Sequence, residues 1–377
     1  MKKILPLFLI LTILHGCKIT QEEKNGIPPE GNKYALGFSV EQFSGYKILK
    51  VFRPWQQNNN GLSVTYILAK DPESVPDSLA IFPIITIPVK KVAALSSGYV
   101  AMISALRESG SLKAVSGSGF IFGDEIRDMI ENHEIVDVGY DQQLNYEMLV
   151  NLDPDVLFLY GVDASVQTTV RKLNEMGIPA VICSDYLETE PLGKSEWIKF
   201  ISEFYDKREA ADSVFNGIEQ RYLIVKKIAE GADNKPVVLS GIPWKDTWYV
   251  PGGRSFAAKY ISDAGGNYLW KDDSSSEVIP LDLEAVYLKA LKADIWINPG
   301  DAGSLKAIRD YDDRFTLLPA FQNGEVYNNN LRINDSGGND YWESGILYPD
   351  LILSDLVGIF HPGLIPGHCW TYYKKLK

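Results

Sequence analysis

The chain has 377 residues, of which 45% are hydrophobic, and this length and composition suffice for two domains that each bury a core. The formal net charge is −12, and no basic run reverses it locally. This balance argues against binding to nucleic acids and to anionic lipid surfaces, because both would repel the chain.

The N-terminus has the pattern of an export signal. A short basic start precedes an almost unbroken apolar run over residues 4–13, which is too short to span a bilayer permanently. Gly16 and Cys17 close the run, and this ending resembles a bacterial lipoprotein cleavage box, apart from His15 where a small residue is usual. We expect a lipoprotein signal peptide over residues 1–16, lipidation at Cys17 and a flexible tether over 17–33, with an ordinary signal peptide as the alternative.

Residues 34–90 alternate apolar and polar side chains, as in 46–51 and 62–68, and an Asn-rich, Gly-containing segment separates these two runs. Alternation with a period of two is typical of half-buried strands, and the segment between the runs indicates a hairpin. We therefore expect a β-rich N-terminal extension.

Residues 91–190 repeat the order strand, Gly- or Ser-containing loop, helix. The short apolar runs that begin these units are 92–95, 112–115, 155–160 and 180–183. Units of this kind predict a parallel sheet covered by helices, and this is the expected N-terminal lobe.

Residues 191–231 are expected to be connecting helices, helical throughout between Ser195 and Gly231, with an apolar stripe at helical spacing from Ala210 to Ala229. A second lobe is expected over 232–377, closing with one helix over 341–360. The predicted fold is α/β, with two Rossmann-like lobes joined by a long backbone helix and a β-rich N-terminal extension.

One unit occurs twice. Residues 145–161 and 282–300 each contain a capping Asn or Asp, a Glu in the first helical turn, a short apolar helix, an aspartate, and an apolar strand that ends in a glycine loop. The two glutamates are Glu147 and Glu284. A unit repeated in two halves indicates a bilobal protein, and such proteins tend to bind their ligand between the lobes.

Several further segments together resemble the periplasmic substrate-binding proteins of iron-siderophore and cobalamin ABC importers, which contain the Fe/B12 periplasmic-binding domain. The similarity extends from about residue 92 to 360. The segments are 139–141, 144–147, 152–157, 172–181, 252–256, 264–267 and the Glu284 unit. The resemblance implies a lipid-anchored, periplasmic, monomeric binding component that delivers its ligand to a membrane permease and its ATPase, and no enzymatic activity.

In this family, a glutamate on each lobe docks onto basic residues of the permease, and the matching positions are Glu147 and Glu284. Two separated carboxylates would set the orientation of the complex and speed its formation. A simpler interpretation is that each glutamate only stabilises the positive end of its helix.

The ligand is expected between the lobes, where the loops at the carboxyl ends of the strands converge. Arg254, beside two glycines and at a helix start, is the strongest single candidate. The aromatic, hydroxyl and arginine side chains that these loops offer are Ser97, Tyr99, Tyr140, Tyr160, Trp244, Trp248, Tyr249, Arg254 and Arg332. They suit a ferric siderophore-type complex first, because two arginines offset an anionic chelate, then cobalamin, with haem as a further alternative. No resident cofactor is expected.

Two other classes of protein compete with this interpretation. An exported enzyme acting on an envelope substrate would need an acid–base pair in the same cleft, and an adhesion module would need a flat apolar patch. A site for a bare metal ion is not expected, because the three histidines after the signal, His133, His361 and His368, lack ligand spacing. Cys183 and Cys369 are expected to be unpaired, although a disulfide is the alternative.

Overall fold

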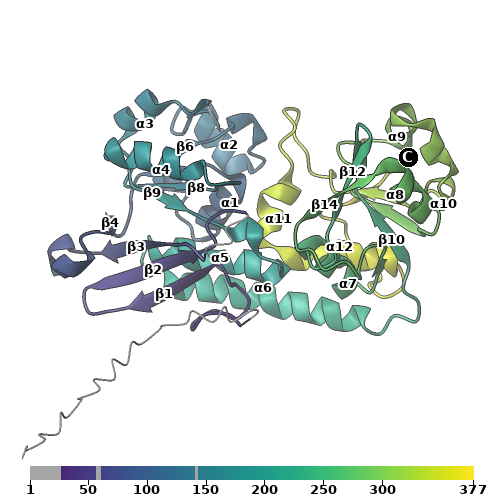
Figure 1. The fold of residues 1–377 in the computed structure, drawn as a ribbon, viewed down its shortest axis with the longest axis horizontal. Helices are drawn as coiled ribbons and strands as arrows, with labels where there is room; N and C mark the ends of the chain where they lie inside the picture. Colours follow the sequence, from purple (N-terminus) through teal and green to yellow (C-terminus); the bar gives the residue numbers. More distant parts are fainter. Residues whose placement is uncertain (1–26, 57–60, 141–142) are drawn as a thin grey trace, which may run out of the picture.

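The computed structural model describes residues 27–56, 61–140 and 143–377. Two α/β lobes lie side by side, and a long helix runs along one edge of both (Figure 1). Each lobe contains a five-stranded sheet, which confirms the predicted α/β class. Among the described residues, no helix is both long and apolar enough to cross a membrane.

The N-terminal lobe has a fully parallel sheet with the order β7-β6-β5-β8-β9. Three of its strands, β5, β8 and β9, are short and buried at every position, as expected for a parallel sheet covered by helices. The strands are β5 (Val92–Ala94), β6 (Leu112–Val115), β7 (Val136–Asp137), β8 (Val156–Leu159) and β9 (Ala180–Ile182), and the helices are α1 (Ser97–Ala105), α2 (Asp124–Glu131), α3 (Tyr146–Leu152) and α4 (Val166–Glu175).

The C-terminal lobe has the strand order β13-β10-β15-β16-β17, in which only β17 is antiparallel to its neighbour. Its main strands are β10 (Val237–Ser240), β13 (Asn267–Tyr268), β15 (Ile295–Ile297), β16 (Val326–Asn328) and β17 (Lys374–Lys375). A small antiparallel sheet contains β11 (Pro243–Trp244), β12 (Thr247–Pro251) and β14 (Val278–Asp282). The helices are α7 (Phe256–Asp263), α8 (Leu283–Ala290), α9 (Leu305–Tyr311), α10 (Pro319–Gln322), α11 (Ser344–Leu347) and α12 (Pro349–Phe360).

The repeated unit occupies equivalent places in the two lobes. In the N-terminal lobe the Glu147 helix, α3, leads into β8, which pairs in parallel with the first strand, β5. In the C-terminal lobe the Glu284 helix, α8, leads into β15, which pairs in parallel with the first strand, β10. The predicted duplication of a fold element is therefore confirmed at the level of topology.

The connection between the lobes consists of two helices, α5 (Pro191–Glu203) and α6 (Arg208–Ala229), so the prediction of uninterrupted helix was wrong. The break falls at Asp206, whose φ of 55° is left-handed and incompatible with a continuing right-handed helix. The 22 residues of α6 span about 33 Å. The predicted closing helix is also divided, because Pro349 starts α12 and lacks the N–H that would continue α11.

The extension forms a four-stranded sheet of β1 (Phe38–Gln42), β2 (Tyr46–Phe52), β3 (Ser63–Ala69) and β4 (Ile84–Thr86). The predicted hairpin is present as the antiparallel pair β2 and β3, whereas β4 adds to β3 in parallel. Phe38 packs edge-on against Trp197 and Phe200 of α5, at centroid distances of 4.9 and 5.4 Å. The extension is therefore packed on the connecting helices.

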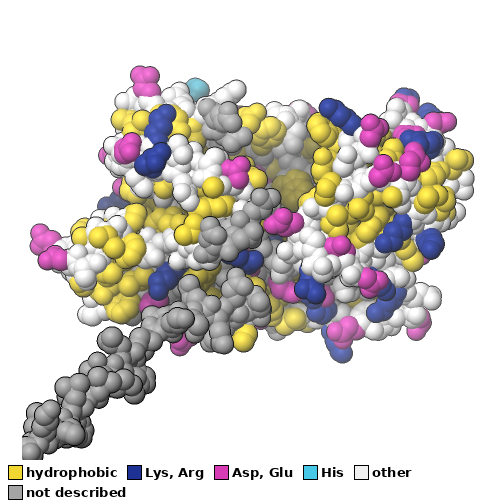
Figure 2. All heavy atoms as spheres, viewed as in Figure 1, with side chains coloured by type: hydrophobic (Ala, Val, Ile, Leu, Met, Phe, Trp, Pro, Cys, Tyr) yellow, Lys and Arg dark blue, Asp and Glu magenta, His cyan; other side chains and the backbone are white. Residues whose placement is uncertain are grey.

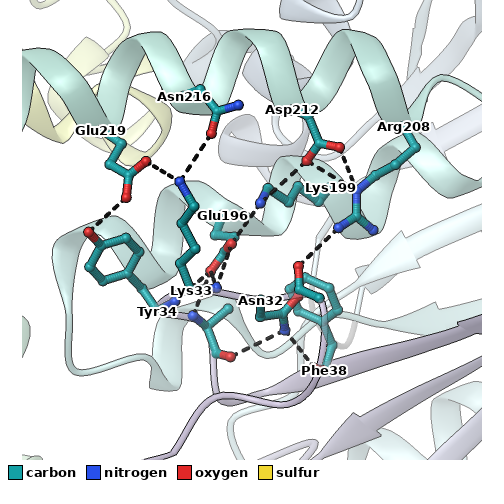
Figure 3. A network of polar contacts seen from close by, with 12 residues as sticks. Asn32, Lys33, Tyr34, Phe38, Glu196, Lys199, Arg208, Asp212, Asn216 and Glu219 are labelled. Carbon is teal, nitrogen blue, oxygen red and sulfur yellow. Dashed lines mark hydrogen bonds and ion pairs between the residues drawn. The ribbon is translucent and has the colours of Figure 1, made fainter.

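A buried carboxylate fixes the start of the extension. Glu196 of α5 is fully buried and accepts hydrogen bonds from the backbone N–H groups of Lys33, Tyr34 and Ala35 at 2.8–3.0 Å (Figure 3). The Lys199 ammonium donates to the same carboxylate at 2.8 Å. Glu219 of α6 adds a bond from the Tyr34 hydroxyl at 2.9 Å. The backbone at residues 33–35 is thus held on the two connecting helices.

Candidate functional site

The two lobes face each other across a hollow (Figure 2). In the N-terminal lobe, the loops that follow β5, β8 and β9 lie at the same edge of the sheet, because these strands are parallel neighbours. Tyr160 follows β8, is exposed, and packs edge-on against Tyr186 at a centroid distance of 6.3 Å. Burial raises the pKa of Tyr186 to about 12, and the carboxylates that act in the same direction include Glu277 of the other lobe. The Tyr186 hydroxyl donates to Gly161 O at 2.5 Å, so Tyr186 lies beside the loop that follows β8.

The small sheet of the C-terminal lobe presents aromatic rings on its outer face. Side chains along β12 alternate between exposed and buried, as the period of a strand requires. Trp244 and Tyr249 are exposed, with 63% of Trp244 open to solvent. Trp248 lies between them in sequence and has 0% exposure, because it packs against Trp296 and Phe315 in the core. The expectation of ligand contact was wrong for Trp248 in this structure.

Tyr99 is also a buried residue and not a cleft residue. Only 2% of it is exposed, and its hydroxyl donates to Asp185 Oδ1 at 3.1 Å beneath the loops. Burial raises the pKa of both Tyr99 and Asp185. The position of Tyr99 in α1 turns its side chain inward, so the expected ligand contact is corrected here as well.

Arg254 lies at one end of the lobe boundary, beside a polar cavity of about 400 Å³. Gly252 and Gly253 permit the close packing there, because a Cβ atom at either position would lie within 2.4 Å of a carbonyl oxygen in the 270–277 loop. The Arg254 backbone N–H donates to Ser275 O at 2.9 Å and its side chain is exposed. The loop thus fixes the backbone and leaves the guanidinium open to a ligand.

Two lysines that were not among the expected ligand residues line the same cavity. Lys259 and Lys271 line it together with Glu190 and Thr189 from the end of the N-terminal lobe. Lys259 is bound to Asp263 at 2.8 Å and lies 3.8 Å from Glu190. Burial raises the pKa of Glu190 although Lys259 opposes this. The cavity is therefore predominantly cationic and spans both lobes.

Ser97 and Arg332 lie at another part of the boundary. Ser97 Oγ donates to the carbonyl of Trp342 at 3.4 Å, which joins the N-terminus of α1 to the C-terminal lobe. Arg332 forms an ion pair with Asp340 at 3.1 Å, and its guanidinium lies 5.2 Å from the centre of the Phe122 ring. Arg332 thus reaches the N-terminal lobe, but it is engaged by protein groups.

The remaining expected ligand residue, Tyr140, is exposed at the end of the segment that follows β7. Sequence reasoning missed Trp342, which is exposed at the lobe junction. Its signal was a tryptophan in a Gly- and Asp-rich loop after a buried strand, a setting in which a large ring has no obvious core to enter.

Glu147 and Glu284 both lie in first helical turns and are exposed. Asn145 caps α3 by accepting from Met148 N at 3.0 Å, and Asp282 caps α8 by accepting from Glu284 N at 2.9 Å. Glu284 is paired with Arg314 at 2.5 Å, whereas the side chain of Glu147 has no hydrogen bond or ion pair with any residue that the structure describes. The two carboxylates thus differ in their local partners.

Cys17 lies outside the described residues, and Cys183 and Cys369 are unpaired, one buried and one exposed. Within the described ranges, no group of three or more His, Cys, Asp or Glu side chains could hold a metal ion. A larger cavity of about 560 Å³ lies away from the lobe boundary, between β3 and α4.

Comparison with known proteins gives one matching family. The sequence profile described as "Periplasmic binding protein" matches residues 92–329, which is more than half of the chain. An uncharacterized lipoprotein of Methanocaldococcus jannaschii is 28% identical over 305 residues, covering 78% of this chain and 70% of that protein.

Two solved structures are similar in fold. A periplasmic heme-binding protein from Pseudomonas aeruginosa superposes with a TM-score of 0.59 at 15% identity, covering 77% of this chain and 98% of that one. An ABC-type Fe3+-hydroxamate transport protein from Saccharomonospora viridis superposes with a TM-score of 0.57 at 17% identity, covering 82% and 99%. Both show the same arrangement of the chain.

Proposed function

The chain belongs to the periplasmic binding protein family, and from this we propose that it is the substrate-binding component of an ABC importer, capturing a metal complex between its lobes. The family consists of binding proteins, so the protein is not an enzyme, and the alternative of an exported envelope enzyme is set aside. The Glu190–Lys259 pair in the cavity is then an electrostatic feature and not an acid–base pair.

The observation that carries this proposal is the composition of the lobe boundary. A cavity of about 400 Å³ that contains Arg254, Lys259 and Lys271 draws residues from both lobes. The exposed rings of Tyr160, Trp244 and Tyr249 lie outside its lining, the first on the N-terminal lobe and the other two on the C-terminal lobe. Cationic groups suit an anionic chelate and aromatic faces suit its apolar parts. A ferric siderophore-type complex is therefore the first candidate, before cobalamin, with haem as a further alternative.

We further propose that the protein is anchored by lipid at Cys17 on the outer side of the cell membrane and acts as a monomer. The similarity to a protein named as a lipoprotein supports this, together with the export pattern of residues 1–17. Glu147 and Glu284 are the proposed contacts to the permease, each presented by an exposed first turn on a different lobe. The proposed domain limits remain those of the sequence analysis, 34–90, 91–190, 191–231 and 232–377.

A thermal-shift screen tests the ligand class. We expect one of ferrioxamine B, cyanocobalamin or haem to raise the melting temperature of the lipid-free protein, because a ligand at 100 times its Kd adds about 2.7 kcal/mol to the unfolding free energy. Unchanged melting curves with all three probes would contradict the assignment. If the protein binds protein partners through a flat apolar patch and none of the three probes, the adhesion alternative is supported.

Arg254→Met is expected to weaken binding of an anionic chelate about tenfold or more, because a hydrogen bond to a charged group contributes about 1.5 to 3 kcal/mol. Arg309→Met is the matched control, since Arg309 lies in the exposed part of α9 and does not line the cavity. Equal affinities of the two variants in fluorescence titration would show that Arg254 is not a ligand contact.

A further inference from the structure

Residues 332–343, which we call the interlobe strap, cross from the C-terminal lobe to the N-terminal lobe. They follow β16 and precede α11, which lies beside α1 and α5 between the lobes (Figure 1). The strap begins as a tight hairpin, with an antiparallel bridge between Ile333 and Asn339 and a hydrogen bond from Asn334 N to Gly338 O at 2.9 Å. It is thus a second connection between the lobes, separate from α6.

The hairpin of the strap binds the backbone of the loop that follows β6. Asn334 Nδ2 donates to Gly119 O at 3.1 Å and to Ile121 O at 2.9 Å. Gly338 lies so close to this loop that a Cβ atom would come within 2.6 Å of Phe120 O. Any larger residue at position 338 would push the hairpin off the N-terminal lobe.

Glu343 fastens the other end of the strap. Its carboxylate accepts from Phe122 N at 2.7 Å and from Gly123 N at 2.8 Å, and only 4% of the residue is exposed. Hydrogen bonds from backbone N–H groups to an ionised carboxylate are about twice as strong as neutral ones. Burial raises the pKa of Glu343, because it disfavours the charged carboxylate. The hydrogen bonds from the two backbone N–H groups oppose this rise. Glu343 therefore joins the strap to the N-terminal lobe at two defined backbone positions.

Trp342 lies directly before this carboxylate and keeps an open ring. Its carbonyl accepts from Ser97 Oγ at the start of α1, and its ring packs edge-on against the buried ring of Tyr341 at 4.7 Å. Even so, 51% of Trp342 is exposed. Ser97 and Tyr341 therefore fix the position of Trp342 near the carboxyl end of β5, the central strand of the N-terminal sheet. Half of the surface of Trp342 stays exposed.

We propose that the interlobe strap fixes Trp342 as a ligand contact, that Trp342 binds an apolar or aromatic part of the ligand, and that Glu343 is the positioning residue that holds the strap in place. This inference rests on the proposed function, because it names a contact for the same ligand.

The strap is tested first without any ligand, by hydrogen–deuterium exchange of the full folded chain. Glu343→Gln leaves one acceptor and turns an amide NH2 toward the second backbone N–H. We expect the amides of Phe122 and Gly123 to exchange at least tenfold faster in this variant. Glu325→Gln is the control, because Glu325 is bound to Lys375 and Tyr327 on the C-terminal lobe. Unchanged exchange in Glu343→Gln overturns the strap.

The ligand contact is tested with whichever of ferrioxamine B, cyanocobalamin and haem stabilises the wild type. Trp342→Ala is expected to weaken binding at least tenfold and Glu343→Gln at least threefold, whereas Trp342→Phe retains an aromatic face and binds within about threefold of the wild type. Trp370→Ala is the control, since Trp370 stacks on Tyr327 in the C-terminal tail.

Wild-type affinity in Trp342→Ala overturns the contact. Equal weakening in Trp342→Ala and Trp370→Ala also overturns it, because the effect would then be general to the lobe. Failure of all three probes to bind the wild type overturns the proposed ligand class together with the contact, while the exchange experiment still decides whether the strap exists.

Discussion

Reversing the charge of both Glu147 and Glu284 to lysine is expected to abolish ligand uptake while ligand affinity stays at the wild-type value. The two carboxylates lie on different lobes, in exposed first turns of α3 and α8. In the proposed docking, each reversal replaces an attraction to a basic permease surface with a repulsion, and like charges placed together at an interface cost several kcal/mol. Neither residue lines the cavity at the lobe boundary, so binding is unaffected.

Uptake is measured in cells that depend on the proposed importer, beside the Kd of the purified variants. Glu125→Lys with Glu209→Lys is the matched control, because these glutamates are also exposed and lie in the first turns of α2 and α6. Loss of Arg314 pairing in Glu284→Lys costs little, since exposed ion pairs contribute about 0 to 1 kcal/mol. Normal uptake by the double variant, or a weaker Kd, would show that the glutamates are not docking residues.

Replacing Glu196 with alanine is expected to reduce the unfolding free energy by about 3 to 5 kcal/mol, the usual cost of removing one partner of a buried ion pair. The variant would leave Lys199, whose side chain is 4% exposed, without its closest carboxylate. It would also leave the backbone N–H groups of Lys33, Tyr34 and Ala35 without acceptors. Asp212, at 3.3 Å from the same ammonium, offsets part of this loss.

Urea denaturation followed by tryptophan fluorescence measures this change. Glu219→Gln is the control on α6, because Glu219 binds the same segment through the Tyr34 hydroxyl and the half-exposed Lys33, and its loss is expected to cost less than about 1 kcal/mol. A fall of less than 1 kcal/mol in Glu196→Ala would mean that the contacts of residues 33–35 do not stabilise the fold. An intact Tm with rapid proteolysis at residues 27–37 would indicate local detachment only.

The local elements followed from the sequence wherever one periodicity dominated. The run 112–115 is strand β6, and the predicted stripe from Ala210 to Ala229 lies on α6, where Ala211, Phe215, Ile218, Tyr222 and Ala229 are the buried residues. The repeated units also proved to be equivalent in topology. The breaks at Asp206 and Pro349 were not foreseen, although the proline was visible, because the apolar pattern continues across both.

The sequence by itself determined the family, the α/β class and the helix starts at Asn145 and Asp282, since capping groups and periodicity act over a few neighbouring residues. Which aromatic side chains face the cleft was decided only by tertiary structure. Trp244 and Trp248 are four residues apart, yet one is exposed and the other is buried against Trp296. Likewise, Glu343 reaches Phe122 across more than two hundred residues. Contacts between distant segments depend on how the lobes pack, and no local pattern in the chain encodes them.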